Sequence, residues 1–122
     1  MQALVIDDSK AMRLILGRML RDLGLEVTEA ADATQALEQL RDGLDPGLVL
    51  VDWNMPGMTG LEFVETVRRT PYASTARLVM VTTETEVVQV VRALAAGADE
   101  YVMKPFTKEA VLEKLQLLGL DL

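Results

Sequence analysis

The chain of 122 residues has the length of one domain and can bury a substantial hydrophobic core. Half of its residues are hydrophobic and the net charge is -7, which argues against generic nucleic-acid binding because that activity needs a cationic surface. The absence of cysteine and histidine excludes disulfides, thiolate metal sites and Ser-His or Cys-His nucleophile pairs.

No apolar run approaches the roughly 18 residues that a membrane-spanning helix requires. The first predicted strand begins near residue 2, which leaves no room for a signal peptide before it. We therefore expect a cytoplasmic protein with a single domain over residues 1–122.

Short apolar runs alternate with segments of helical periodicity along the whole chain. Strands are predicted at 3–6, 25–29, 48–52, 77–82 and 100–103, and helices at 9–23, 33–42, 86–96 and 107–118. A further helix is predicted to carry Leu61, Val64 and Val67. The apolar face predicted for the first helix consists of Met12, Ile15, Leu16, Met19, Leu20 and Leu23. Glycines stop three of these helices, and Asp32 is a predicted N-cap.

Five strand-helix units in strict alternation predict an α/β fold with one parallel, doubly wound sheet and helices on both faces. The strands at 48–51 and 78–81 are apolar without interruption, which is typical of a sheet buried on both sides. In such sheets, ligands bind beyond the carboxyl ends of the strands.

Polar side chains stand at four of these strand ends. Asp7 and Asp8 follow the first strand, Asp52 ends the third, and Thr82 and Lys104 end the fourth and fifth. Each residue alone has an ordinary interpretation as a turn, a cap, a strand end or a surface lysine. Taken together, they predict one pocket that contains three carboxylates, a hydroxyl and an ammonium.

Close carboxylates repel one another, and a cation would relieve that repulsion. Oxygen ligands without histidine or cysteine select a hard ion, and carboxylates with open water positions suit Mg²⁺. Asp52 is then a candidate nucleophile for a phosphoryl group, with Asp7 and Asp8 holding the metal and Lys104 as a second cation. A cis peptide bond before Pro105 would direct that ammonium inward.

Four segments of the chain resemble the receiver domain of two-component response regulators, most of all the single-domain chemotaxis regulators. The segments are Ile6–Ser9, Val51–Leu61, Met80–Thr82 and Tyr101–Phe106. The resemblance covers almost the whole chain and implies the flavodoxin-like strand order 2-1-3-4-5.

The resemblance implies that Asp52 accepts a phosphoryl group from the phosphohistidine of a histidine kinase. It implies that Mg²⁺ is bound directly by Asp8, Asp52 and the main-chain carbonyl of Asn54, and through water by Asp7. Lys104 would pair with the phosphoryl group and Thr82 would move toward it.

The same family pattern implies an output surface formed by residues 86–96, 100–103 and 107–118, on which Tyr101 turns from exposed to buried. The phosphorylated surface would bind a downstream protein, such as the flagellar switch. Among the valines of helix 86–96, one or two exposed side chains are candidates for a partner patch. Such a protein is a signalling switch rather than an enzyme, although it assists its own phosphorylation and dephosphorylation.

Two further positions match the family in loops that approach the attacking water. Asn54 lies two residues after Asp52, and Glu84 lies two residues after Thr82. We expect them to set the dephosphorylation rate and to make the phosphorylated state short-lived.

Several alternatives share part of this pattern. The alternatives to an output switch are a relay intermediate or phosphate sink that has no output partner, and a receiver cut from a larger DNA-binding or enzymatic regulator. A haloacid-dehalogenase-type phosphatase would need an Asp-x-Asp motif that Asp7-Asp8-Ser9 lacks. A flavodoxin-like flavin protein would need a hydroxyl-rich and glycine-rich loop there, since carboxylates repel a phosphate.

Overall fold

The computed structural model of the chain describes residues 1–72, 75–83, 87–120 and 122. Its centre is a sheet of five strands, β1 (Gln2–Ile6), β2 (Glu26–Ala30), β3 (Leu48–Asp52), β4 (Arg77–Thr83) and β5 (Glu100–Lys104). All neighbouring strands are parallel, and their order is β2-β1-β3-β4-β5. The predicted fold class and strand order are both confirmed.

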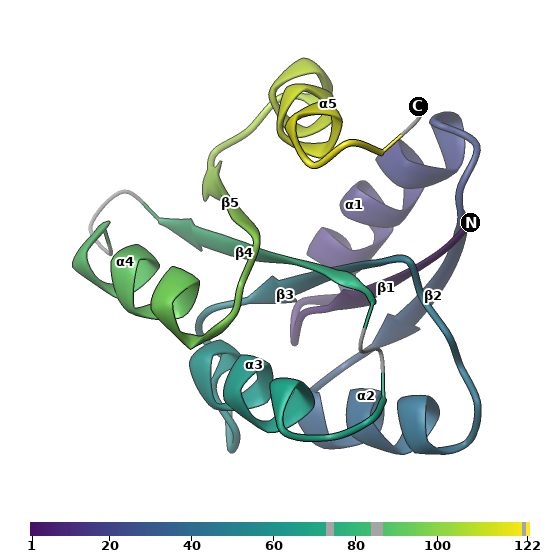
Figure 1. Ribbon diagram of the computed structural model, residues 1–122. Coiled ribbons are helices and arrows are strands. Elements are labelled where there is room, and N and C mark those ends of the chain that lie inside the picture. The colour runs from purple at the N-terminus through teal and green to yellow at the C-terminus, as the bar shows by residue number, and fades with distance from the viewer. Residues whose placement is uncertain (73–74, 84–86, 121) are drawn as a thin grey trace.

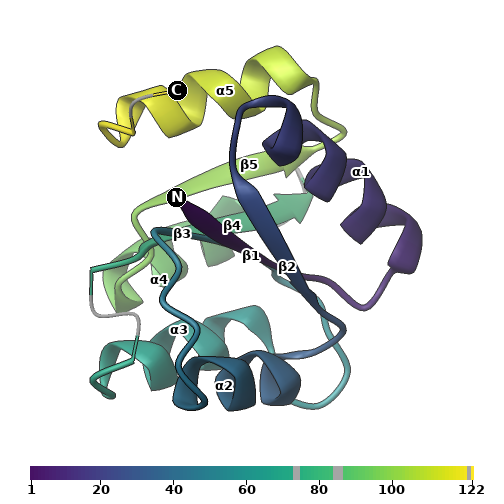
Figure 2. The same ribbon diagram turned by 90° about the vertical axis from the view of Figure 1, so that its right-hand side faces the viewer.

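In the described residues, five helices cover the two faces of the sheet. They are α1 (Lys10–Asp22), α2 (Ala33–Arg41), α3 (Gly60–Arg68), α4 (Val87–Ala96) and α5 (Lys108–Leu117). Helices α1 and α5 lie on one face, and α2, α3 and α4 lie on the other (Figures 1 and 2). The core is therefore divided into two layers by the sheet.

The alternation of side chains along each strand fills both layers. In β1, Leu4 and Ile6 belong to the cluster under α2 and α3, whereas Ala3 and Val5 belong to the cluster under α1 and α5. Every residue of β3 is buried, as the uninterrupted apolar run predicts. This burial fixes the register of the central strands and therefore the positions of the residues at their carboxyl ends.

Side-chain oxygens cap four of the helices. Ser9, Asp32 and Thr107 accept hydrogen bonds from main-chain amides in the first turns of α1, α2 and α5. Thr59 forms a reciprocal capping box with Glu62 at the start of α3. The predicted N-cap at Asp32 is confirmed, and the caps fix where the chain turns from each strand end into the next helix.

The predicted element bounds agree with the observed ones or differ from them by one residue. The largest difference in a strand is at β2, which begins at Glu26 and ends at Ala30 instead of covering 25–29. The expectation that Ile15 faces the core is wrong, because its side chain is 47% exposed. Leu16 and Leu20 form the buried stripe of α1, and Ile15 lies about 100° around the helix from Leu16.

A polar clamp joins α3 to the turn between α4 and β5. The guanidinium of Arg68 donates to the carbonyl of Gly97 (2.9 Å) and to Oδ2 of Asp99 (2.9 Å). The same Asp99 oxygen accepts from the amide of Leu78 at the start of β4 (2.8 Å). The clamp thus lies at the opposite end of the sheet from the carboxylates and closes that end of the α3/α4 layer.

No helix in the described part of the chain is both long enough and apolar enough to cross a membrane.

The clamp should contribute to stability. We expect Asp99→Asn to lower the free energy of unfolding by about 2 kcal/mol, because it leaves Arg68 without its partly buried charged partner. Urea unfolding measures the change. Asp42→Asn is the matched control, since the Arg41–Asp42 pair is exposed and should contribute less than about 0.5 kcal/mol. Equal losses in the two variants would contradict a structural role for the clamp.

Candidate functional site

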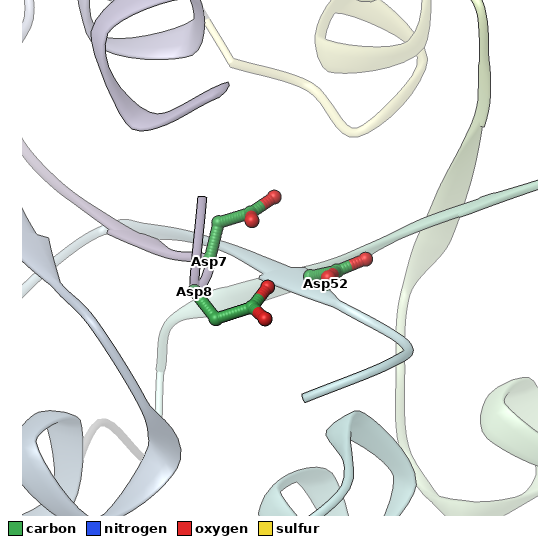
Figure 3. Close-up of side chains that lie close together, drawn as sticks. All are labelled: Asp7, Asp8 and Asp52. Atoms are coloured by element: carbon green, nitrogen blue, oxygen red, sulfur yellow. The ribbon is translucent and has the colours of Figure 1, made fainter. Parts of the chain in front are cut away.

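Three carboxylates converge where β1 and β3 end side by side (Figure 3). Asp7 and Asp8 directly follow β1, and Asp52 is the last residue of β3. Each offers one oxygen, and these oxygens all lie within 4.8 Å of one another. The structure therefore brings together the carboxylates that the sequence placed at one edge of a parallel sheet.

The two neighbouring aspartates have different surroundings. Asp8 is exposed, whereas Asp7 is almost completely buried. Oδ1 of Asp7 accepts a hydrogen bond from the amide of Ser9 (2.9 Å). Oδ2 of Asp7 is buried and accepts no hydrogen bond from the described residues. A buried carboxylate oxygen of this kind is costly unless a cation or a water molecule satisfies it.

Lys104 supplies the nearby positive charge. Its Nζ donates to Oδ1 of Asp52 (3.2 Å) and lies 3.7 Å from Oδ2 of Asp7. Lys104 is the last residue of β5, and the peptide bond that joins it to Pro105 is cis. One ammonium therefore faces two buried carboxylates from the far side of β4.

The single positive charge of Lys104 does not neutralise the three carboxylates. Burial raises the pKa of Asp52 above its ordinary value, the negative charge of Asp7 raises it further, and Lys104 only partly opposes both. Negative charge exceeds positive charge among these groups, every donor atom is a hard oxygen, and one buried oxygen lacks a hydrogen bond. Such a donor set fits a hard divalent cation such as Mg²⁺.

The other predicted residues lie at or near the same edge. Thr82 is buried and follows Val81, which pairs with Asp52 in the sheet. Asn54 is exposed two residues beyond Asp52. Tyr101 is partly exposed on β5, with the ammonium of Lys114 4.3 Å from the centre of its ring. Glu84 lies outside the described residues.

The structure adds two residues that the sequence did not single out. Gly60 begins α3 so close to the site that a Cβ atom there would lie 2.5 Å from the carbonyl oxygen of Asp52. Arg13 of α1 donates to the carbonyl oxygen of Asp7 (2.7 Å). The glycine-containing loop after Asp52 could have indicated the close approach at Gly60 from the sequence. Nothing in the local pattern of α1 marks the second, because its other partner is sixteen residues away.

Comparisons with known proteins agree with this geometry. A family model described as the response regulator receiver domain matches residues 3–116. The chemotaxis protein CheY of Pseudomonas aeruginosa is 43% identical over 117 residues, which cover 95% of this chain and 94% of that protein. The chemotaxis protein CheY1 of Helicobacter pylori is 40% identical over 119 residues, or 97% of this chain and 96% of the relative. The solved structure of CheY4 from Vibrio cholerae is 36% identical, with a TM-score of 0.87 over 96% of this chain and 97% of that one.

The raised pKa of Asp52 predicts how stability depends on pH without divalent cations. Because folding disfavours the ionised carboxylate, stability should fall as the pH rises from the ordinary aspartate value through the raised one. Asp52→Asn should therefore unfold a few degrees higher than the wild type at neutral pH, and this advantage should shrink in acid.

Thermal unfolding in EDTA between acidic and neutral pH measures the difference. Asp45→Asn, at an exposed position, is the control with the same change of charge. An advantage of Asp52→Asn that is constant or that grows toward acid pH would contradict the proposed repulsion.

Proposed function

Because the chain belongs to the response regulator receiver domain family, we propose that it is a switch whose phosphoacceptor is Asp52. The observation that carries the proposal is the buried Asp52 carboxylate beside two further carboxylates, with Nζ of Lys104 3.2 Å from its Oδ1. Membership of this family supports the phosphohistidine of a histidine kinase as the phosphodonor, and a partner must supply that group because this chain has no histidine.

In the transfer step, a carboxylate oxygen of Asp52 attacks the phosphorus atom. The new P–O bond forms as the P–N bond of the donor breaks, and its electron pair remains on the imidazole nitrogen. The ammonium of Lys104 is placed to pair with an oxygen of the incoming phosphoryl group. The buried hydroxyl of Thr82, at the end of the adjacent strand, would donate to another oxygen.

The carboxylates of Asp8 and Asp52 and the main-chain carbonyl of Asn54 would hold Mg²⁺, and Asp7 would contact it through water. Bound there, the ion would offset the negative charge of the carboxylates and of the phosphoryl group. The exposure of Asp8 and the burial of Asp7 support this division, because Asp8 is open to an arriving ion.

Phosphorylation would change the output surface through Lys104 and Thr82. Thr82 is the penultimate residue of β4, which precedes α4, and Lys104 is the last residue of β5, which precedes α5. A new pairing of these side chains with the phosphoryl group would shift the balance between two arrangements of the helices. Tyr101, on the strand that ends in Lys104, would become more buried. In this structure its ring borders a groove of about 290 Å³ together with Phe106 and Lys114.

The surface around α4 supports an output partner more than a phosphate sink. Val88 and Val91 of α4 are 77% and 65% exposed, and Met103 of β5 is also exposed. Exposed apolar side chains of this kind mark interaction sites when they gather on one face. We propose a downstream signalling protein as the partner, with the flagellar switch as a candidate, and a cytoplasmic location for both.

Trp53 should report the chemistry because it is buried directly after Asp52. We expect its fluorescence to change when Mg²⁺ is added, and to change again when beryllofluoride or acetyl phosphate follows. Asp52→Asn should abolish the second change, since it removes the nucleophilic carboxylate. A wild-type protein that responds to neither addition would contradict the proposed function.

The same signal tests the proposed lifetime. After acetyl phosphate is removed, it should return to its starting value well within an hour, since Asn54 and Glu84 match the family positions that allow water to attack. A response that persists for many hours would exclude this part of the proposal.

A further inference from the structure

We propose that Arg13 is a positioning residue for the metal site, holding the loop between β1 and α1 so that Asp7 and Asp8 face Asp52. This inference rests on the proposed Mg²⁺ site, and it concerns a residue outside the set of ligands. The inference is based on hydrogen bonds of the Arg13 guanidinium, which join that loop to the end of β2.

The loop that carries the two aspartates is short, and its last residue, Ser9, caps α1. It runs from Asp7 to Ser9, between the end of β1 at Ile6 and the first turn of α1. The amide of Asp7 donates to the carbonyl of Ala30 (3.2 Å), which extends the pairing of β1 with β2 by one residue. The amide of Ser9 donates back to Asp7 Oδ1 (2.9 Å). Neither contact involves the side chain of the exposed Asp8.

Arg13 adds a link from the first turns of α1. Its Nη1 donates to the carbonyl oxygen of Asp7 (2.7 Å), and its Nε donates to Oε1 of Glu29 (3.2 Å). The Arg13 side chain is only 16% exposed, so these contacts are protected from solvent more than an ordinary surface pair. The rigid fork of the guanidinium fixes the peptide group between Asp7 and Asp8 relative to β2.

Glu29 is itself held in place. Its Oε2 lies 3.8 Å from Nη2 of Arg21, which is near the C-terminal end of α1. The main-chain carbonyl of Glu29 accepts from Nε2 of Gln39 in α2 (3.2 Å). Glu29, which holds Arg13, is therefore part of the edge strand β2 and contacts helices on both faces of the sheet. A displacement of the Asp7 carbonyl would have to break its hydrogen bond with Nη1 of Arg13, which at 2.7 Å is the shortest of these contacts.

Charge and position predict opposite effects of Arg13 on metal affinity. A fixed positive charge close to the carboxylates repels Mg²⁺, so its removal would strengthen binding if charge alone mattered. If Arg13 orders the loop, its removal weakens binding, because part of the binding free energy must then order Asp7 and Asp8. The direction of the change therefore distinguishes the two roles.

The experiment is a Mg²⁺ titration of the full chain, followed by Trp53 fluorescence, for the wild type, Arg13→Met, Arg13→Lys and Arg21→Met. Arg21→Met is the matched control. It removes the same charge from the same helix and also loses a contact with Glu29, but Arg21 is half exposed. Circular dichroism and urea unfolding establish that each variant is folded at the temperature of the titration.

We expect Arg13→Met to raise the Kd for Mg²⁺ by about 3- to 10-fold, below the 10- to 100-fold typical of residues that contact a ligand side chain directly. Arg13→Lys keeps the charge but cannot reproduce the fork, so its Kd should lie between those of the wild type and Arg13→Met. Arg21→Met should bind Mg²⁺ as the wild type does or slightly more tightly. In the absence of metal, the Ser9 amide should exchange with solvent faster in Arg13→Met than in Arg21→Met.

Two results would overturn the inference while leaving the proposed function intact. One is a wild type that binds Mg²⁺ together with an Arg13→Met variant that binds it equally well or more tightly. The other is a loss of affinity in Arg21→Met as large as in Arg13→Met. A wild type with no response to Mg²⁺ would instead overturn the proposed metal site itself.

Discussion

The repulsion among Asp7, Asp8 and Asp52 is the interaction on which the rest of the site depends. Burial and the charge of Asp7 raise the pKa of Asp52, and Lys104 opposes this increase only in part. The folded protein therefore maintains an excess of negative charge in a place where a divalent cation and a phosphoryl group can be accommodated together. A divalent cation bound by these carboxylates would relieve their repulsion and would also offset the negative charge of an incoming phosphoryl group.

The scaffold tolerates this repulsion because the elements around it are fixed by independent contacts. The fully buried β3 holds Asp52, Arg13 joins the β1–α1 loop to β2, and the Arg68–Asp99 clamp closes the opposite end of the α3/α4 layer. The exposed valines of α4 lie between that clamp and the site edge. If phosphorylation shifts α4 as proposed, the contact between Arg68 of α3 and the Gly97 carbonyl would hold the end of α4 that lies away from the site.

The sequence was sufficient for the fold and for the convergence of the carboxylates, because uninterrupted apolar strands and parallel topology together determine which residues share an edge. It did not place Ile15, since Leu14, Ile15 and Leu16 are all apolar and only packing decides which of them faces the sheet. It also did not indicate Arg13 or Arg68. Their partners are main-chain carbonyls and acidic residues far away in the sequence, so the local periodicity of hydrophobic residues does not predict these contacts.

The most direct test of the phosphoacceptor is to locate the modified residue itself. The wild-type protein is incubated with acetyl phosphate and Mg²⁺, and intact-mass measurement followed by peptide mapping determines where the phosphoryl group is attached. We predict one phosphoryl group per chain, located on Asp52. No phosphoryl group should be transferred when EDTA replaces Mg²⁺ in the incubation. Modification at another residue, or an unchanged yield in Asp52→Asn, would contradict the central claim.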